Sequence, residues 1–396
     1  MNIKIEKICR RNKIEEKEAQ RQEAGMRTMR KENTEFRILS AIAIILVVAG
    51  HLGFNAFDLG GLFPYYSFHV FIFLFVSGYF YKKESEEHIM SYIAGKCKTL
   101  LLPYFVWNVF YGLVATLLHK AGFVIGQDIS LYTLFVAPFE NGHHFMYHFP
   151  AWFVPVLFVI EVINVCMRKV LGLLRLNKEW LIFAGCLLAG VLVVALAIDG
   201  RAWGYYKIPG RILFMLPGFQ MGCLYREKIE KHDTLPDKVY FPLVMGAQLL
   251  ISLLNAGLAF SVVWVASFAN GPFVPYLTVM TGIAFWLRIS RILAKFPGIS
   301  DGLVRIGRNT FSVMMHHIFV FFLFNTVFYF LSQLTSFCSE FDKNMYFADV
   351  NYVYMASVSE AGKWLYLIAG IMIPLWIGMV TDRVKNELRG RNPKKD

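Results

Sequence analysis

Several ionisable side chains interrupt long apolar stretches of this sequence, where an uncompensated charge is costly. His51 ends the run IILVVAGH, His69 lies within FHVFIF, and His316 and His317 form a pair within VMMHHIFV. Ionisable groups inside a bilayer tend to mark a functional site. Imidazole suits proton transfer as a general base, or group transfer as a nucleophile. The alternative for each is a structural histidine that anchors a helix end or binds a backbone carbonyl.

The spacing of these histidines predicts where they lie in a membrane. Fourteen residues separate His51 from Arg37, which is roughly 20 Å along a helix and places His51 in the outer half of the bilayer. A short loop then returns the chain, so His69 is expected at a similar depth and the two rings could share a proton path. His316 and His317 point about 100° apart, so one of them is expected to face the bundle centre, and the sequence does not choose between them.

A carboxylate and a guanidinium occupy two further apolar stretches. Glu161 lies about ten residues into a predicted span and therefore near the bilayer midplane, where it must be protonated, paired or in contact with water. Arg211, near the outer end of another span, is a possible partner for Glu161. Arg211 is also a candidate donor to a developing oxyanion. The alternative for both residues is a purely structural ion pair.

The composition indicates the kind of fold that holds these ionisable side chains in place. Charged residues make up 17% of the chain, against about 25% in soluble domains. Long apolar runs near the ~20 residues needed to cross a membrane predict an all-α, polytopic helix bundle of about ten transmembrane helices. The predicted spans are 38–54, 65–81, 99–119, 150–167, 180–198, 208–225, 239–256, 272–290, 309–330 and 363–380.

The distribution of positive charge predicts the orientation. With the N-terminus inside, 34 of the 40 Lys and Arg residues lie in cytoplasmic segments, so both termini are expected in the cytoplasm of a multi-pass protein of the cell membrane. The net charge of +12 therefore reflects topology and not binding to nucleic acid. Residues 1–36 form a charged tail, either solvated or lying on anionic membrane lipids, and residues 382–396 form a basic tail.

Other sequence features narrow the chemistry. The chain shows no Gly-rich phosphate loop, no Cys/His cluster with metal-ligand spacing and no internal repeat, so no metal cofactor is expected. Two outer loops are long, 120–149 and 331–362. The second carries Tyr346, Tyr352 and Tyr354, which would suit a sugar ring but also any exposed loop.

Five stretches resemble those of the acyltransferase 3 family, which comprises polytopic membrane enzymes that transfer acyl groups, commonly acetyl, to envelope polysaccharides and other small acceptors. The Phe-His start of the second stretch is most similar to the fucose 4-O-acetylase branch. The resemblance covers roughly 36–381 and implies a transmembrane acyltransferase domain over 37–381. The stretches are FRILSAIAIILVVAGH (36–51), SFHVFIFLFVSGY (67–79), KCKTLLLPY (96–104), AWFVP (151–155), and IGRNTFS (306–312) followed by His316 and His317.

The resemblance implies that acetyl-CoA is the acyl donor and that a glycan or lipid-linked sugar hydroxyl is the acceptor. The donor phosphates are expected at the cytoplasmic mouth, on Arg37, Lys96 and Lys98. The family usually carries an arginine eleven residues before the first-span histidine. Here that position is Ser40, and Arg37 lies one helical turn earlier.

His51 would act as general base or as acyl-carrying nucleophile, with His69, His316, His317 or Arg211 supplying a donor to the oxyanion. The competing interpretations are a transporter or flippase of a glycan or small metabolite, and a non-catalytic membrane scaffold. Paired halves with broken helices would favour a transporter, and the sequence shows none. A scaffold would have no need of histidine, arginine and glutamate within its spans. Cleavage of a thioester by purified protein separates an enzyme from both.

Overall fold

The fold is an all-α bundle. The structure is a computed structural model that describes residues 34–140, 142, 144–264, 267–336, 338–355 and 360–388. Within these ranges the only β-type pairing is a bridge between Phe260 and Phe268. The first helix is Thr34–His51. The other α-helices are α2 (His69–Tyr79), α3 (Ile89–Lys96), α4 (Leu102–Lys120), α5 (Leu131–Phe135), α6 (Ala137–Glu140), α7 (Phe153–Leu173), α8 (Glu179–Ile198), α9 (Lys207–Leu224), α10 (Asp237–Leu254), α11 (Val274–Leu293), α12 (Pro297–Arg308), α13 (Thr310–Leu334), α14 (Lys343–Ala348) and α15 (Ala361–Leu388).

Short helical turns connect or extend these α-helices. A π-helical turn, η3 (Cys97–Leu101), joins α3 to α4, so the two form one continuous helix, Ile89–Lys120, that begins well before the predicted span 99–119. A 3-10 turn, η4 (Met146–Trp152), leads directly into α7. The remaining turns are η1 (Tyr65–Ser67), η2 (Lys83–Glu86), η5 (Gly204–Tyr206), η6 (Tyr225–Ile229) and η7 (Glu230–His232).

All ten predicted spans fall on helices, and eight of these helices are long and apolar enough to cross a membrane, as far as the described residues go. The fold is that of a multi-pass membrane protein. The two exceptions are α2 and α9. With 11 residues α2 extends only ~16 Å, because a proline and a 3-10 turn take up the start of the predicted span. The 18-residue helix α9 is long enough but is less apolar.

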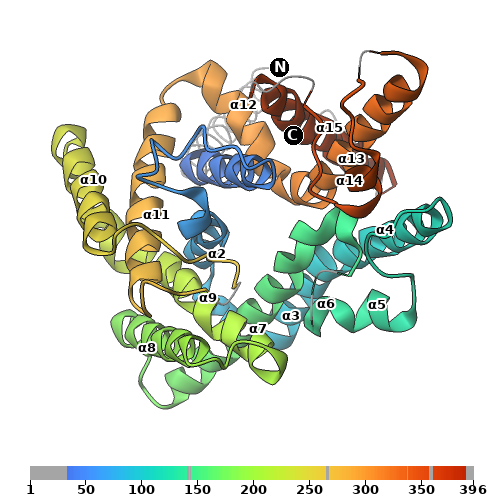
Figure 1. Ribbon diagram of the computed structural model, residues 1–396. Helices are drawn as coiled ribbons and strands as arrows, with labels where there is room; N and C mark the ends of the chain where they lie inside the picture. Colours follow the sequence, from blue (N-terminus) through green and yellow to red (C-terminus); the bar gives the residue numbers. More distant parts are fainter. Residues whose placement is uncertain are drawn as a thin grey trace, which may run out of the picture.

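The position of α2 and α9 explains why they can be short or polar. In Figure 1 α2 lies near the middle of the bundle, and α9 packs along both α2 and α8. A Cβ added at Gly78 would lie 1.9 Å from the carbonyl oxygen of Phe219, and one added at Gly222 would lie 2.0 Å from that of Phe75. Small residues thus let the two backbones touch. A helix enclosed in this way is shielded from lipid and need not be apolar.

A buried polar network joins α7, α8 and α9. The guanidinium of Arg168 donates from Nη1 and Nη2 to the two carboxylate oxygens of Glu179, at 2.9 and 2.8 Å, and also to Gln220 and Asn164. Both charged side chains are almost fully buried. Because each is paired and hydrogen-bonded, the network tolerates burial that would destabilise either charge alone.

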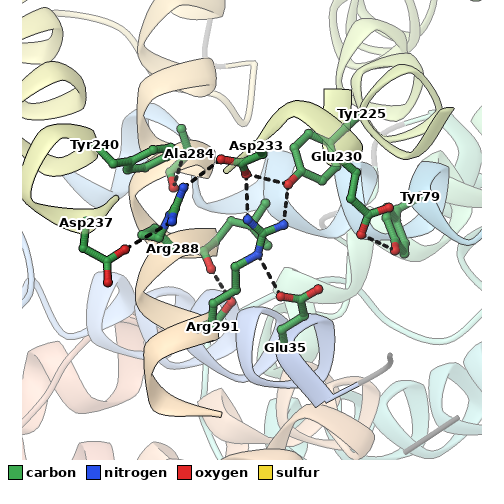
Figure 2. Close-up of polar contacts among 12 residues, drawn as sticks. Glu35, Tyr79, Tyr225, Glu230, Asp233, Asp237, Tyr240, Ala284, Arg288 and Arg291 are labelled. Atoms are coloured by element: carbon green, nitrogen blue, oxygen red, sulfur yellow. Dashed lines mark hydrogen bonds and ion pairs between the residues drawn. The ribbon is translucent and has the colours of Figure 1, made fainter. Parts of the chain in front are cut away.

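A second network lies at the end of the bundle where the first helix begins, which is predicted to be cytoplasmic. Figure 2 shows Arg291 of α11 between Glu35, the second residue of the first helix, and Asp233 in the loop after η7. Its Nε donates to Glu35 at 2.8 Å and its Nη1 to Asp233 at 2.7 Å. Arg288, which also lies on α11, binds Asp233 and Asp237. The network fixes the start of the helix that carries His51.

The long outer loop does not present its tyrosines as expected. Tyr346 and Tyr354 are only 5% and 6% exposed, and the Tyr346 ring stacks on Phe322 and Tyr329. Binding of a sugar by this loop stays a prediction, but the rings of Tyr346 and Tyr354 are not exposed for it. They form an aromatic core beneath the loop, because amphipathic rings bury their bodies wherever the hydroxyl finds a partner.

Two exposed positions allow a direct test of the orientation. In a variant whose cysteines are replaced by alanine, Val124→Cys should react in intact cells with an impermeant thiol reagent, whereas Met90→Cys should react only after permeabilisation. The two side chains form a matched pair, since they are 75% and 78% exposed. The positive-inside distribution places Val124 outside and Met90 inside. The reverse labelling pattern would contradict the orientation.

Candidate active site

His51 and His317 lie against each other at the centre of the candidate site. The ring of His51, at the end of the first helix, stacks on that of His317 in α13 with centroids 5.2 Å apart and planes 30° apart. Phe149 of η4 meets the His51 ring edge-on at 4.9 Å. His51 is partly exposed, whereas His317 is fully buried. Of the two histidines between which the sequence did not choose, His317 is the one that lies next to His51.

The hydrogen bonds of His317 determine its protonation pattern. Nδ1–H donates to the carbonyl oxygen of Val313 at 2.7 Å, one helical turn earlier. A carbonyl can only accept, so in the neutral ring Nε2 carries the lone pair. Within the described structure this Nε2 is buried without a hydrogen-bond partner. In the neutral ring this nitrogen can accept a hydrogen bond or a proton but cannot donate one.

His316 points in a different direction, toward α4. The hydroxyl of Tyr111 lies 2.7 Å from His316 Nδ1, and the Trp107 ring meets His316 edge-on at 4.2 Å. His316 is therefore held against the first half of α4. Its role as a direct oxyanion donor stays a prediction, but the structure gives it different neighbours from His317.

Sequence reasoning missed a polar cluster behind His316. The Tyr111 ring stacks flat on His148 at 4.6 Å, and Nε2 of His148 and of His144 both contact Asn108 Oδ1, at 2.9 and 3.0 Å. Burial lowers the pKa of His144 to about 4, so this ring is neutral at pH 7. The signal that could have revealed the cluster is the i, i+3 spacing of Asn108 and Tyr111, which places two polar groups on one face of an apolar helix.

His69 lies at the start of α2, close to the end of the first helix. Its Nδ1 lies 2.6 Å from the carbonyl oxygen of Tyr65. The hydroxyl of Tyr65 in turn donates to the carbonyl oxygen of Gly50, at 3.3 Å, and the Tyr65 ring covers Gly50. Tyr65 thus links His69 to the turn of helix that carries His51. A shared proton path between the two histidines stays a prediction.

The expected pairing of Glu161 with Arg211 is wrong. Glu161 accepts instead from Lys96 Nζ, at 2.7 Å, and is almost fully buried. The physical reason is the continuous helix through η3, which carries Lys96 into the bundle. Lys96 was expected as a ligand of the donor phosphates, and its partner in this structure is a carboxylate.

Arg211 has a different environment. Its guanidinium lies over the Trp152 ring at 4.3 Å and is only 4% exposed. Within the described residues no carboxylate pairs with it, and its Nε is buried without a hydrogen-bond partner. A buried guanidinium stacked on an aromatic face keeps its planar hydrogen-bonding edge available for an oxyanion.

The other predicted phosphate ligands lie near a pocket of about 190 Å³ between α4, α12, α13 and α15. Arg37 is exposed, and its backbone touches Gly307, the residue before Arg308. Lys98 is exposed next to the pocket-lining Thr99. The pocket is lined by Thr99, Pro103, Trp107, Arg308, Asn309, Phe311, Ser312, Gly378, Thr381, Asp382 and Lys385.

The pocket lies toward the predicted cytoplasmic end, and one of its lining residues contacts His316. Arg308 and Lys385 bring positive charge to it, although Lys385 Nζ lies 3.9 Å from Asp382 Oδ1 in the same lining. Trp107 lies both in its wall and against His316. Cationic groups at a mouth with an aromatic interior suit a ligand that has charged phosphates at one end and a thin apolar arm at the other.

The comparisons with known proteins agree with this architecture. A family model described as an acyltransferase domain, of the acyltransferase 3 type, matches residues 33–384. No curated protein and no solved structure matches the chain. The match spans most of the chain, including the first helix, α2, α13 and every residue that lines the pocket except Lys385. The chain belongs to the acyltransferase 3 family of membrane acyltransferases.

Proposed function

We propose that this acyltransferase moves an acyl group, in the simplest case acetyl, from cytoplasmic acyl-CoA to a hydroxyl of a cell-envelope or extracellular carbohydrate. The observation that supports this best is the stacked His51–His317 pair, with the Nε2 of His317 buried and unpartnered among the described residues. It stands in a chain whose family transfers acyl groups.

The pair supports general base catalysis because it can hold one proton but not two. Two imidazolium rings 5.2 Å apart would repel each other. With both rings neutral, the partly exposed His51 takes the proton of the acceptor hydroxyl. The hydroxyl oxygen bonds to the thioester carbonyl carbon, the carbon–sulfur bond breaks, and the departing thiolate recovers the proton. In the alternative route the His51 nitrogen takes the acyl group first and then passes it to the hydroxyl.

The two routes differ in a measurable intermediate. Incubation of the purified protein with acetyl-CoA labelled in the acetyl group, without acceptor, leaves label on the protein only if a histidine is acylated. Rapid denaturation followed by counting of the protein fraction separates the routes. Direct transfer predicts no label above that of a His51→Ala control.

The test of the function itself uses release of free CoA thiol. Purified protein in detergent or nanodiscs should cleave acetyl-CoA in a manner that depends on added glycan. Envelope glycans from cells with the gene should carry an alkali-labile ester that is missing from cells without it. A transporter or scaffold would release no thiol. Acylation of a small soluble metabolite instead of a glycan would retain the enzyme but reject the carbohydrate acceptor.

The pocket provides a prediction for donor binding. Arg308→Gln should raise KM for acetyl-CoA by about fivefold or more at low salt, with little change in kcat, because an exposed cation contributes to phosphate binding and not to the distant chemistry. The difference from wild type should shrink as the salt concentration rises. The matched control is Lys238→Gln, an exposed cation in the first turn of α10, at the predicted cytoplasmic end. A fall in kcat alone would remove Arg308 from donor binding.

A further inference from the structure

Arg211 is a buried cation for which the described structure contains no anion. It is 4% exposed, its Nε has no hydrogen-bond partner, and its one close partner is the neutral Trp152 ring. Leaving such a group uncompensated costs several kcal/mol in a protein interior. A structural role would be served by a nearby carboxylate, as Glu179 serves Arg168. The absence of such a group among the described residues indicates that the anion comes from a ligand.

A second cation lies close to Arg211 on the same helix. Lys207 lies one helical turn before Arg211 on α9, so the two positive charges share one face of the helix. Lys207 also lies over the Trp203 ring at 5.7 Å. Two cation–aromatic pairs therefore follow each other at this end of α9.

The 3-10 turn η4 links Arg211 to the histidine pair. Phe149 contacts His51, and Trp152, three residues later, contacts Arg211. Residues i and i+3 of a 3-10 helix lie on the same side, ~6 Å apart along the axis. Phe149 and Trp152 thus lie on the same side of η4, so this one short turn contacts both His51 and Arg211.

The location of Arg211 argues against the donor as the source of the anion. The phosphates of acyl-CoA are proposed to bind at Arg308 and Lys385, at the end where the first helix begins. Arg211 lies thirteen residues, or ~20 Å, before the end of α9 that leads to the Asp233 network in Figure 2. By this counting Arg211 lies at a depth similar to that of His51 and away from the proposed phosphate site.

We infer that Arg211, stacked on Trp152, binds an oxyanion group of the acceptor, a carboxylate or a phosphate, next to the hydroxyl that His51 deprotonates. The acceptor class is then an acidic sugar or a sugar phosphate, and not a neutral glycan. This inference rests on the proposed carbohydrate acceptor. A guanidinium recognises either oxyanion with two parallel hydrogen bonds, which fixes the orientation of the ring beside the base.

The test measures binding by the purified full chain without acyl donor, so that it does not depend on acyl transfer. Calorimetric titration compares glucuronate, glucose 1-phosphate and glucose at equal ionic strength. At least one of the two charged sugars should bind tenfold or more tightly than glucose, and the stronger one identifies the oxyanion. Arg211→Gln should remove this preference, whereas Arg211→Lys should retain part of it, because the charge remains without the bidentate geometry.

Two controls distinguish ligand binding from a structural role. Arg201→Gln, which changes an exposed arginine near α9, should leave the preference intact. Arg211→Gln should melt at or above the wild-type temperature, since it removes a buried charge that lacks a protein partner. Equal binding of charged and neutral sugars by wild type, no binding of either charged sugar, or a full preference in Arg211→Gln would each overturn the inference. Failure of thioester cleavage would instead reject the proposed function.

Discussion

The variant His51→Ala should lose acyl transfer by about two to four orders of magnitude while the protein still inserts and melts near the wild-type temperature. The magnitude is that expected for a general base. The small effect on stability follows because His51 is partly exposed at a helix end, so truncation leaves neither a large cavity nor an unpaired buried charge. Release of CoA thiol in the presence of acceptor measures the activity, and a thermal unfolding curve in detergent measures the stability.

The matched control for this variant is His232→Ala, which removes an exposed histidine from η7 in the predicted cytoplasmic loop. It should keep wild-type activity. If His51→Ala retained more than about a tenth of the activity, the base would have to be another group, and His317 would be the first to test. Loss of activity in both variants would point to a general effect of the substitutions on folding.

The second large effect concerns stability. Glu179→Gln should destabilise the protein by about 3–5 kcal/mol, because it leaves the guanidinium of Arg168 buried without a counter-charge. Thermal unfolding in detergent should show a lower midpoint temperature. Replacing both partners with leucine should recover much of the loss, since an apolar pair of similar volume needs no compensation.

The control is Glu227→Gln, which removes another carboxylate that pairs with Lys83. This pair is largely exposed, so the free energy of unfolding should change by less than about 1 kcal/mol. If Glu179→Gln and Glu227→Gln lowered the free energy of unfolding by similar amounts, the Arg168 network would contribute no more than an exposed ion pair. A double leucine variant as unstable as Glu179→Gln would show that packing, and not charge, determines the loss.

The sequence predicts where the helices lie more accurately than it predicts which of them are long and apolar enough to cross a membrane. Apolar runs near twenty residues identify helices because lipid-facing positions must be apolar. The exceptions, α2 and α9, contact mainly other helices, so neither length nor hydropathy constrains them in the same way. Their contact through Gly78 and Gly222 is a tertiary feature, which single residues in the sequence do not reveal.

For the candidate site, too, the sequence identifies residues but not their tertiary contacts. The candidate histidines stand out because polar groups in apolar runs are unusual, but their partners depend on packing between distant segments. Helical geometry showed that His316 and His317 diverge, and only the fold shows which one meets His51. The Lys96–Glu161 pair was missed because a π-helical turn extends α4 backward into the cytoplasmic segment. Asn108 and Tyr111 were overlooked because neither carries a charge.

The first helix is held by hydrogen bonds at both ends, so its length sets a fixed distance within the bundle. Arg291 holds Glu35 at one end, and beyond the other end Lys363 donates to the carbonyl oxygen of Gly53 at 3.0 Å. A helix fixed in this way cannot slide along its axis to collect an acyl group. If acyl-CoA binds as proposed, with its phosphates near Arg37, the fourteen residues from Arg37 to His51 separate those phosphates from the acyl carbon by roughly 20 Å along the helix. Acetyl phosphate is far shorter than this distance, so the proposed arrangement calls for a donor with a long arm.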